Sequence, residues 1–271
     1  MFEQANSGPL VIGLNPSGLK FSKGSWLWVG LWPFLPGTHL VNQALEEKFP
    51  KRLVGFATHL NLQISKYVEI CGKTLSKKDE KRTEALILRK LAFKNDQSTF
   101  QKGVSKASLG LKENFCKVFS LLGIERNSIV SSYVPIRSEI NTIAIVDWLR
   151  EIGCTICLPV IERENYPLKF FVWEAGAKLV TSKFGIPIPV NRKLVDPNIL
   201  LCPLVSFDKG ANRLGYGGGY YDRTIQKLRE QRKIHAFGVA FSEQQSRNSL
   251  PSDDFDQKLD VVITDKNYFI F

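Results

Sequence analysis

The chain has 271 residues, of which 37 are Lys or Arg and 26 are Asp or Glu, so its formal net charge at pH 7 is +11. The hydrophobic share is 44% and the charged share 23%, a globular mixture that argues against a wholly disordered or collagen-like chain. No window holds about 18 consecutive apolar residues, so we expect no membrane partner. The basic excess attracts anions without saying which. Because Lys and Arg are scattered along the chain, we expect no nucleic-acid partner.

Residues 1–78 show no clean helical or strand period. Gly, Pro and Ser interrupt the segment, and its tryptophan-rich apolar run is broken by Pro33 and Pro36, which is a poor match to a secretory signal. We interpret residues 1–78 as a poorly ordered N-terminal extension of unknown role, and residues 79–271 as one domain.

From about Lys81 onward the pattern becomes regular. Apolar periodicity predicts helices over residues 84–94, 103–122, 141–151 and 220–232, and strands over 128–134, 154–159, 168–173, 199–205, 235–241 and 259–264. Strands that alternate with helices predict an α/β fold, with a mainly parallel sheet flanked by helices in a Rossmann-like three-layer arrangement.

The five cysteines form no clear disulfide framework, which favours a reducing compartment and a cytoplasmic protein. Cys154 and Cys157 form a CxxC within the predicted strand 154–159, where the odd offset directs the two side chains to opposite faces. No second CxxC and no nearby histidine accompany them. We therefore interpret both as core residues rather than as a redox or zinc site.

One glycine-rich segment, residues 203–223, carries the chemistry. It follows an apolar strand, precedes a helix and holds four glycines within five residues, Gly215 and Gly217 to Gly219. Glycines allow close approach of a ligand, and backbone N–H groups that lead into a helix form a phosphate site. Arg213 would add a bidentate contact, and Asp222 would hold Mg²⁺ that bridges phosphates. The pattern is neither a Walker A loop nor a dinucleotide GxGxxG, and the alternative is a flexible loop before an ordinary helix.

Residues 213–223, Arg-Leu-Gly-Tyr-Gly-Gly-Gly-Tyr-Tyr-Asp-Arg, resemble the signature of the 5-formyltetrahydrofolate cyclo-ligase family, also called 5,10-methenyltetrahydrofolate synthetases. Flanking pieces agree, so the resemblance covers about residues 80–271 and makes this part the cyclo-ligase catalytic domain. Three positions depart from the family pattern: Ala85 replaces a Lys, Ile188 a Glu and Phe255 a His. The resemblance implies that this Lys is half of the family's ATP contact, for which Lys81, Arg82 or Lys90 would substitute from the same helix region.

The resemblance implies an enzyme that uses ATP and Mg²⁺ to convert 5-formyltetrahydrofolate to 5,10-methenyltetrahydrofolate, with release of ADP and phosphate. The reaction would pass through a phosphorylated formyl group, an imidate phosphate. The folate, polyglutamylated or not, would be the partner of a monomeric protein. One alternative is another ATP-dependent small-molecule ligase or kinase that uses the same turn. Another is a nucleic-acid-binding protein without catalysis.

The resemblance also implies roles for individual residues. Arg213 and Tyr221 would be catalytic, and Asp222 would bind the metal, with a helix N-cap as its alternative. The implied nucleotide-binding residues are Arg89, Arg213, Leu214, Gly215, Tyr216, Gly217, Gly218, Gly219, Tyr220, Tyr221 and Asp222. The implied folate-binding residues are Tyr133, Glu139, Tyr216, Gly217, Gly218, Gly219 and Tyr220. The alternatives are a charge at the next helix N-terminus for Glu139, a solvated face for Arg89 and packing for the tyrosines.

Overall fold

The computed structural model describes residues 13–15, 18–20, 76–99 and 104–271. The chain divides into two compact units, Met1–Glu80 and Lys81–Phe271. In the first unit, β1 (Gly13–Asn15) pairs antiparallel with β2 (Gly18–Lys20). Most of the predicted N-terminal extension, including its expected disorder, lies outside the described residues.

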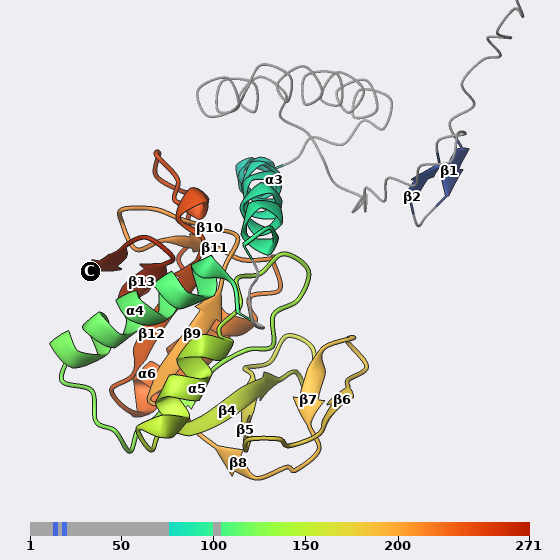
Figure 1. Cartoon of the computed structure of the whole chain (residues 1–271). Coiled ribbons are helices and arrows are strands. Elements are labelled where there is room, and N and C mark those ends of the chain that lie inside the picture. Colours follow the sequence, from blue (N-terminus) through green and yellow to red (C-terminus); the bar gives the residue numbers. More distant parts are fainter. Residues whose placement is uncertain (1–12, 16–17, 21–75, 100–103) are drawn as a thin grey trace, which may run out of the picture. The chain divides into compact units, whose positions relative to one another are not determined.

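A mixed sheet forms the centre of the second unit (Figure 1). Its strands are β3 (Ile129–Ser131), β4 (Thr155–Val160), β5 (Lys169–Val172), β8 (Leu194–Val195), β9 (Ile199–Pro203), β12 (His235–Ala240), β13 (Val261–Thr264) and β14 (Tyr268–Ile270). Their order in the sheet is β14-β13-β12-β9-β3-β4-β5-β8. The run from β13 to β4 is parallel, and the outer strands pair antiparallel. The predicted mainly parallel sheet is confirmed.

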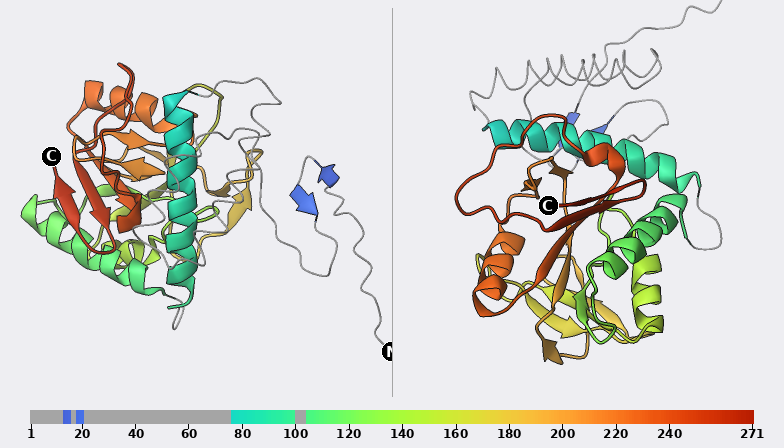
Figure 2. Two further views of the ribbon diagram at one scale, coloured as in Figure 1. Left: turned by 90° about the horizontal axis from the view of Figure 1, so that it is seen from above. Right: turned by 90° about the vertical axis from the view of Figure 1, so that its left-hand side faces the viewer.

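Helices cover both faces of this sheet. The helices α4 (Lys106–Leu121) and α5 (Ile143–Glu151) pack on one face, and α6 (Tyr220–Gln231) packs on the other. The α3 helix (Lys77–Gln97) lies across the side of the sheet where the parallel strands end (Figure 2). A short 3₁₀ turn, η1 (Ser242–Gln244), follows β12. The three-layer α/β arrangement therefore matches the expectation from the sequence.

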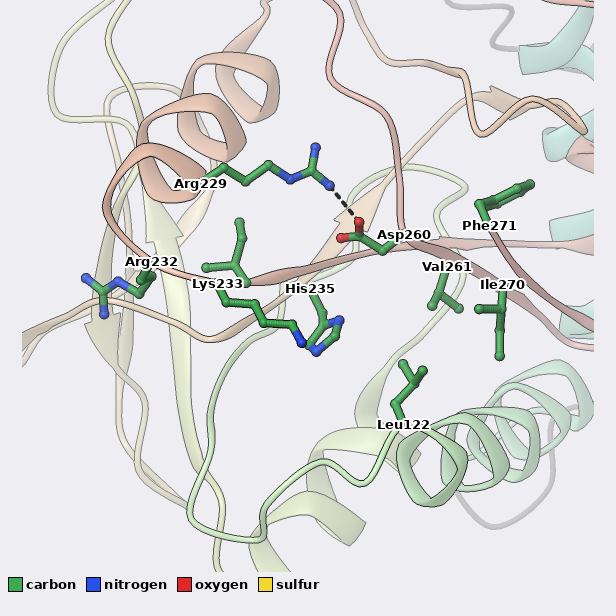
Figure 3. A pocket seen from close by; sticks show the side chains of 10 residues that line it. Leu122, Arg229, Arg232, Lys233, His235, Asp260, Val261, Ile270 and Phe271 are labelled. Atoms are coloured by element: carbon green, nitrogen blue, oxygen red, sulfur yellow. Dashed lines mark hydrogen bonds and ion pairs between the residues drawn. The ribbon is translucent and has the colours of Figure 1, made fainter.

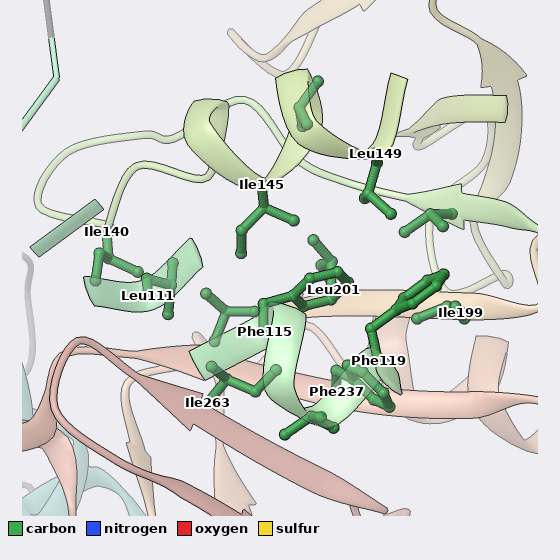
Figure 4. Close-up of a cluster of buried hydrophobic side chains, with 14 of the residues drawn as sticks. Leu111, Phe115, Phe119, Ile140, Ile145, Leu149, Ile199, Leu201, Phe237 and Ile263 are labelled. Atoms are coloured by element: carbon green, nitrogen blue, oxygen red, sulfur yellow. The ribbon is translucent and has the colours of Figure 1, made fainter. Parts of the chain in front are cut away.

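Two apolar clusters hold the layers together. The first cluster includes Phe115 and Phe119 of α4 and Phe237 of β12 (Figure 4). Phe115 packs edge-on against Phe237 and against Trp148 of α5. The second cluster lies between the sheet and α6 and includes Ile225 and Leu228. The central strands are apolar on both faces because each face is covered.

The cysteine pair confirms the predicted alternation. Cys154 belongs to the cluster under α4 and α5, whereas Cys157 belongs to the cluster under α6. Both thiols are buried and unpaired, and burial raises the pKa of each. They are core residues on opposite sides of the sheet.

The predicted elements differ from the structure mainly at their ends. The α3 helix begins seven residues earlier than the predicted 84–94, because the Ser76 hydroxyl accepts a hydrogen bond from the Asp79 amide (3.2 Å) and two acidic residues occupy the first turn. The short strands β8 and β14 were not predicted. Nor were β6 (Leu179–Thr181), β7 (Pro187–Pro189), β10 (Ser206–Phe207) and β11 (Arg213–Leu214). Strands of two or three residues are too short to show a period of two.

Candidate active site

The glycine turn, residues 215–219, connects β11 to α6. Gly217 and Gly219 have φ angles of 99° and 61°, in the left-handed region that favours glycine. Gly219 is the N-cap of α6, and among the described residues no side chain caps it. The first N–H groups of α6 therefore follow an exposed turn and donate no hydrogen bond to a side chain at the N-cap.

Arg213 and Asp222, on either side of this turn, bind each other. Arg213 Nη2 donates to Asp222 Oδ1 (2.6 Å), and Arg213 Nη1 donates to the carbonyl of Gln257. The backbone N–H of Gln257 also donates to Asp222 Oδ1 (3.1 Å). The N-cap alternative for Asp222 is wrong, because the cap is Gly219 and Asp222 is the third residue of α6.

Arg89 is buried, and its guanidinium hydrogen-bonds to three other parts of the fold. Its side chain is only 1% exposed, so the alternative of a solvated face is wrong. Nε donates to Ser138 Oγ (3.2 Å), Nη1 to the Leu204 carbonyl (3.2 Å) and Nη2 to the Tyr216 hydroxyl. One guanidinium thus joins α3 to the end of β9, to the loop before α5 and to the glycine turn.

Glu139 lies beside Arg89 and is also buried, with 5% of its side chain exposed. Oε2 accepts a hydrogen bond from the Ile136 amide (3.0 Å), and Oε1 is 4.0 Å from Arg89 Nη1. Burial raises the pKa of Glu139, although the Ile136 bond and Arg89 oppose this shift. The alternative role at the following helix is wrong, because α5 begins at Ile143 and has no acidic residue in its first turn.

The predicted tyrosines fall into two kinds. The Tyr133 hydroxyl donates to the Ile140 carbonyl (3.0 Å) inside the core. Tyr216 is 40% exposed, and the guanidiniums of Arg89 and Arg137 lie 5.1 and 5.3 Å from its ring centre.

Tyr220 and Tyr221 begin α6 and pack against the second apolar cluster. The Arg223 guanidinium carbon lies 5.2 Å from the Tyr220 ring centre. The Tyr221 hydroxyl is buried and has no hydrogen-bond partner within the described residues.

The structure also brings in Arg82, one of the three candidates for the missing lysine, and two residues that the sequence did not single out as site residues, Arg223 and Gln244. Arg82 Nε donates to the Gly215 carbonyl (2.8 Å), and Arg223 Nη2 donates to the Gly218 carbonyl (2.6 Å). Buried Gln244 donates to the carbonyls of Leu204 and Val205 (2.8 and 3.0 Å), where β9 ends. A signal existed for Arg82, which precedes Arg89 by seven positions and therefore shares its helix face.

The three departures from the family pattern occupy different environments. Ala85 is buried in α3, and Ile188 packs with Val160 and Phe171 in a small apolar cluster. Phe255 is 82% exposed.

A pocket of about 480 Å³ lies at the opposite end of the sheet (Figure 3). His235 and Val261, the first residues of β12 and β13, line it, and Arg229 there pairs with Asp260 (2.9 Å). The predicted site residues, all of which are described, do not line this pocket. It is therefore separate from the glycine turn.

The described residues contain neither a membrane-spanning helix nor a cluster of metal ligands. No helix there is long and apolar enough to span a bilayer. No cluster of three or more His, Cys, Asp or Glu side chains there could enclose a metal ion.

Residues 75–265 match the 5-formyltetrahydrofolate cyclo-ligase family. The chain belongs to this family. A cyclo-ligase of Haemophilus influenzae is 35% identical over 141 residues, which cover 49% of this chain and 74% of that protein. A cyclo-ligase of Mycolicibacterium smegmatis is 28% identical over 146 residues, covering 51% and 73% of the two chains.

A solved structure agrees with the cyclo-ligase assignment. The 5,10-methenyltetrahydrofolate synthetase of Aquifex aeolicus superposes with a TM-score of 0.52 at 26% identity and covers 69% of this chain and 92% of that one. The chain is thus a ligase of folate one-carbon metabolism with the cyclo-ligase fold.

Proposed function

We propose that this chain uses ATP to convert 5-formyltetrahydrofolate to 5,10-methenyltetrahydrofolate, with release of ADP and phosphate. The proposal is carried by the N-terminus of α6. It follows the exposed glycine turn, and in the described residues no side chain caps it. Arg82 and Arg223 donate to the carbonyls of this turn. Such a concentration of backbone N–H groups and guanidiniums suits a phosphate chain.

The residues at the turn fit a nucleotide with its metal ion. The glycine backbone and the first N–H groups of α6 would hold the phosphates. Asp222 would meet Mg²⁺ through Oδ2, because its bonds to Arg213 and Gln257 both use Oδ1. One protein carboxylate is enough where the phosphates and water supply the remaining oxygens.

The chemistry requires positioning more than a protein nucleophile. An amide-like formyl group is a poor electrophile, and bound ATP would supply the phosphoryl group that turns the formyl oxygen into a leaving group. The N10 nitrogen would then attack the formyl carbon, and phosphate would depart as the ring closes. Preorganised donors would stabilise the charge on the transferred group.

Glu139 would bind the donor-rich edge of the pterin, because a carboxylate accepts hydrogen bonds and does not donate them. Its Oε1 is the oxygen without a close partner in the described residues, since Arg89 stands 4.0 Å away. The buried hydroxyl of Tyr221, which lacks a partner there, would donate to the substrate or to phosphate.

The direct test is formation of the methenyl product from 5-formyltetrahydrofolate, ATP and Mg²⁺, with Asp222→Asn as the variant. We expect kcat at saturating substrates to fall by about 10-fold or more. The matched control is Asp196→Asn, which removes a carboxylate from another Arg–Asp pair, with Arg232 at 2.7 Å, and should change kcat by less than about twofold.

Unchanged turnover by Asp222→Asn would remove Asp222 from the metal site. If the wild-type chain instead released ADP only with other acceptors, a different ATP-dependent ligase or kinase activity would replace the proposal.

A further inference from the structure

The pocket at the end of the sheet opposite the glycine turn contains groups that the proposed function does not use. Its volume of about 480 Å³ falls within the range of about 300 to 1,000 Å³ that is typical of small-molecule sites. The first residues of β12 and β13, His235 and Val261, line it, and no residue of the glycine turn does. A ligand bound here would therefore leave the glycine turn open to a nucleotide.

One side of this pocket is apolar. The side chains of Leu122, Val261, Ile270 and Phe271 lie together there (Figure 3). Ile270 and Phe271 are 48% and 47% exposed. The backbone N–H of Phe271 donates to the Asp260 carbonyl (3.0 Å), which fixes the backbone of this wall beside β13. An apolar group placed against the wall would remove apolar surface from water, which is favourable.

Two polar side chains at the same pocket have no partner in the described part of the chain. Lys233 and His235 both line the pocket, and neither side chain forms a hydrogen bond or an ion pair with another described residue. The His235 ring instead packs edge-on against the Phe237 ring, with the ring centres 6.0 Å apart. An ammonium group and an imidazole N–H are both hydrogen-bond donors, so together they suit an acidic group.

The other charged side chains of the pocket already bind protein groups. Arg229 Nη2 donates to Asp260 Oδ1 (2.9 Å), and the backbone N–H of Ala236 donates to Asp260 Oδ2 (2.7 Å). Arg232 Nη2 donates to Asp196 Oδ2 (2.7 Å). Both oxygens of the one carboxylate that lines the pocket thus have donors from the protein. Among the titratable side chains of this pocket, Lys233 and His235 are the ones left to meet a ligand.

We propose that this pocket binds a small organic anion with an aromatic or aliphatic body. The acidic group of the ligand contacts Lys233 and His235, and its apolar body covers Val261, Ile270 and Phe271. An inorganic anion would leave the apolar wall exposed to water, and an uncharged apolar molecule would leave both donors without an acceptor. Few polar groups that converge on a mainly apolar pocket are the usual composition of a small-molecule site.

The test is a fluorescence titration of the full chain with two probes that share one ring system. Anilinonaphthalene sulfonate carries an acidic group, and phenylnaphthylamine is the same skeleton without it. We expect the sulfonate to saturate one site on the wild type, and Lys233→Gln to weaken its affinity by about 10-fold, because a charged hydrogen bond is lost. Binding of the uncharged probe should change by less than about twofold in Lys233→Gln. Phe271→Ala should weaken both probes by about fivefold, because both lose apolar contact.

The matched control is Lys227→Gln, which removes the same charge from an exposed position of α6 outside the pocket. Its affinity for the sulfonate should stay within about twofold of the wild type. Equal losses in Lys233→Gln and Lys227→Gln, or unchanged binding in both Lys233→Gln and Phe271→Ala, would overturn the proposal. So would the absence of saturable binding to the wild type. Displacement of the sulfonate by MgATP would place the probe at the glycine turn and would also overturn it.

Discussion

The hydroxyl of Tyr221 is buried and has no hydrogen-bond partner in the described residues. Burial raises the pKa of Tyr221 well above its usual value, and nearby Cys202 and Glu139 raise it further. The hydroxyl therefore keeps its proton in the neutral range and remains a donor. A buried donor that makes no bond costs stability, and the proposed function gives this hydroxyl a bond to the substrate or to phosphate.

Replacement of Tyr221 by Phe separates the effect of the hydroxyl on stability from its effect on ligand binding. We expect the free energy of unfolding of Tyr221→Phe to stay the same or rise by about 1 kcal/mol, because an unsatisfied polar group is removed. We expect kcat/KM to fall by about 10-fold, because a bond to the ligand is lost. Urea unfolding and steady-state kinetics measure the two quantities.

Tyr133→Phe is the control for stability, since the Tyr133 hydroxyl already donates to the Ile140 carbonyl. Its loss should lower the free energy of unfolding by about 1 kcal/mol. A Tyr221→Phe variant that is destabilised and fully active would show that the hydroxyl serves the fold.

At the scale of elements, α4 is held unusually close to the turn between β13 and β14. A Cβ atom on Gly110 would stand 2.3 Å from the Asp265 carbonyl oxygen. One turn later on the same face, the Asn114 side chain donates to the Thr264 carbonyl (3.0 Å). The Asp265 carboxylate in turn accepts a hydrogen bond from the Ser242 amide (2.7 Å). This contact fixes the helix layer against the end of the sheet.

Gly110→Ala should therefore destabilise the protein, although helix propensity alone predicts that it stabilises α4. In an ordinary helix this change stabilises by about 1 kcal/mol, but here the added methyl group meets backbone. We expect the free energy of unfolding to fall by about 1 to 3 kcal/mol, as measured by urea unfolding. Ser120→Ala, at an exposed position of α4, should change it by less than about 0.5 kcal/mol. Stabilisation of Gly110→Ala would mean that the helix does not approach Asp265 so closely.

At the scale of the whole molecule, the cyclo-ligase match and the second compact unit nearly coincide. The match covers residues 75–265, and the unit covers Lys81–Phe271. This unit contains the whole eight-stranded sheet and both apolar clusters. We propose that residues 79–271 are the catalytic domain and that residues 1–78 are an extension whose role lies outside catalysis.

A shortened chain that begins at Ser76 tests this division and keeps α3 complete. We expect its kcat and its unfolding midpoint to equal those of the full chain, because the shortened chain retains the sheet, the clusters and the glycine turn. The methenyl-product assay and urea unfolding measure these quantities. A folded but inactive shortened chain would show that the extension contributes to the site.

The sequence by itself determined the α/β class, the mainly parallel sheet, the opposite faces of Cys154 and Cys157, and the glycine turn before α6. These features depend on local periodicity and on the backbone freedom of glycine, which neighbouring residues reveal. The short strands at the edges left no such period.

Only the tertiary structure decided which partner each arginine has. Arg89 reaches Leu204 and Arg82 reaches Gly215, at sequence separations of 115 and 133 positions. A guanidinium has five donors on a long flexible stem, so its neighbours in the sequence do not specify whether it binds a carbonyl, a carboxylate or a ligand. In the folded chain, Arg89 and Arg213 are buried and bind protein groups. Arg82 binds the Gly215 carbonyl of the glycine turn.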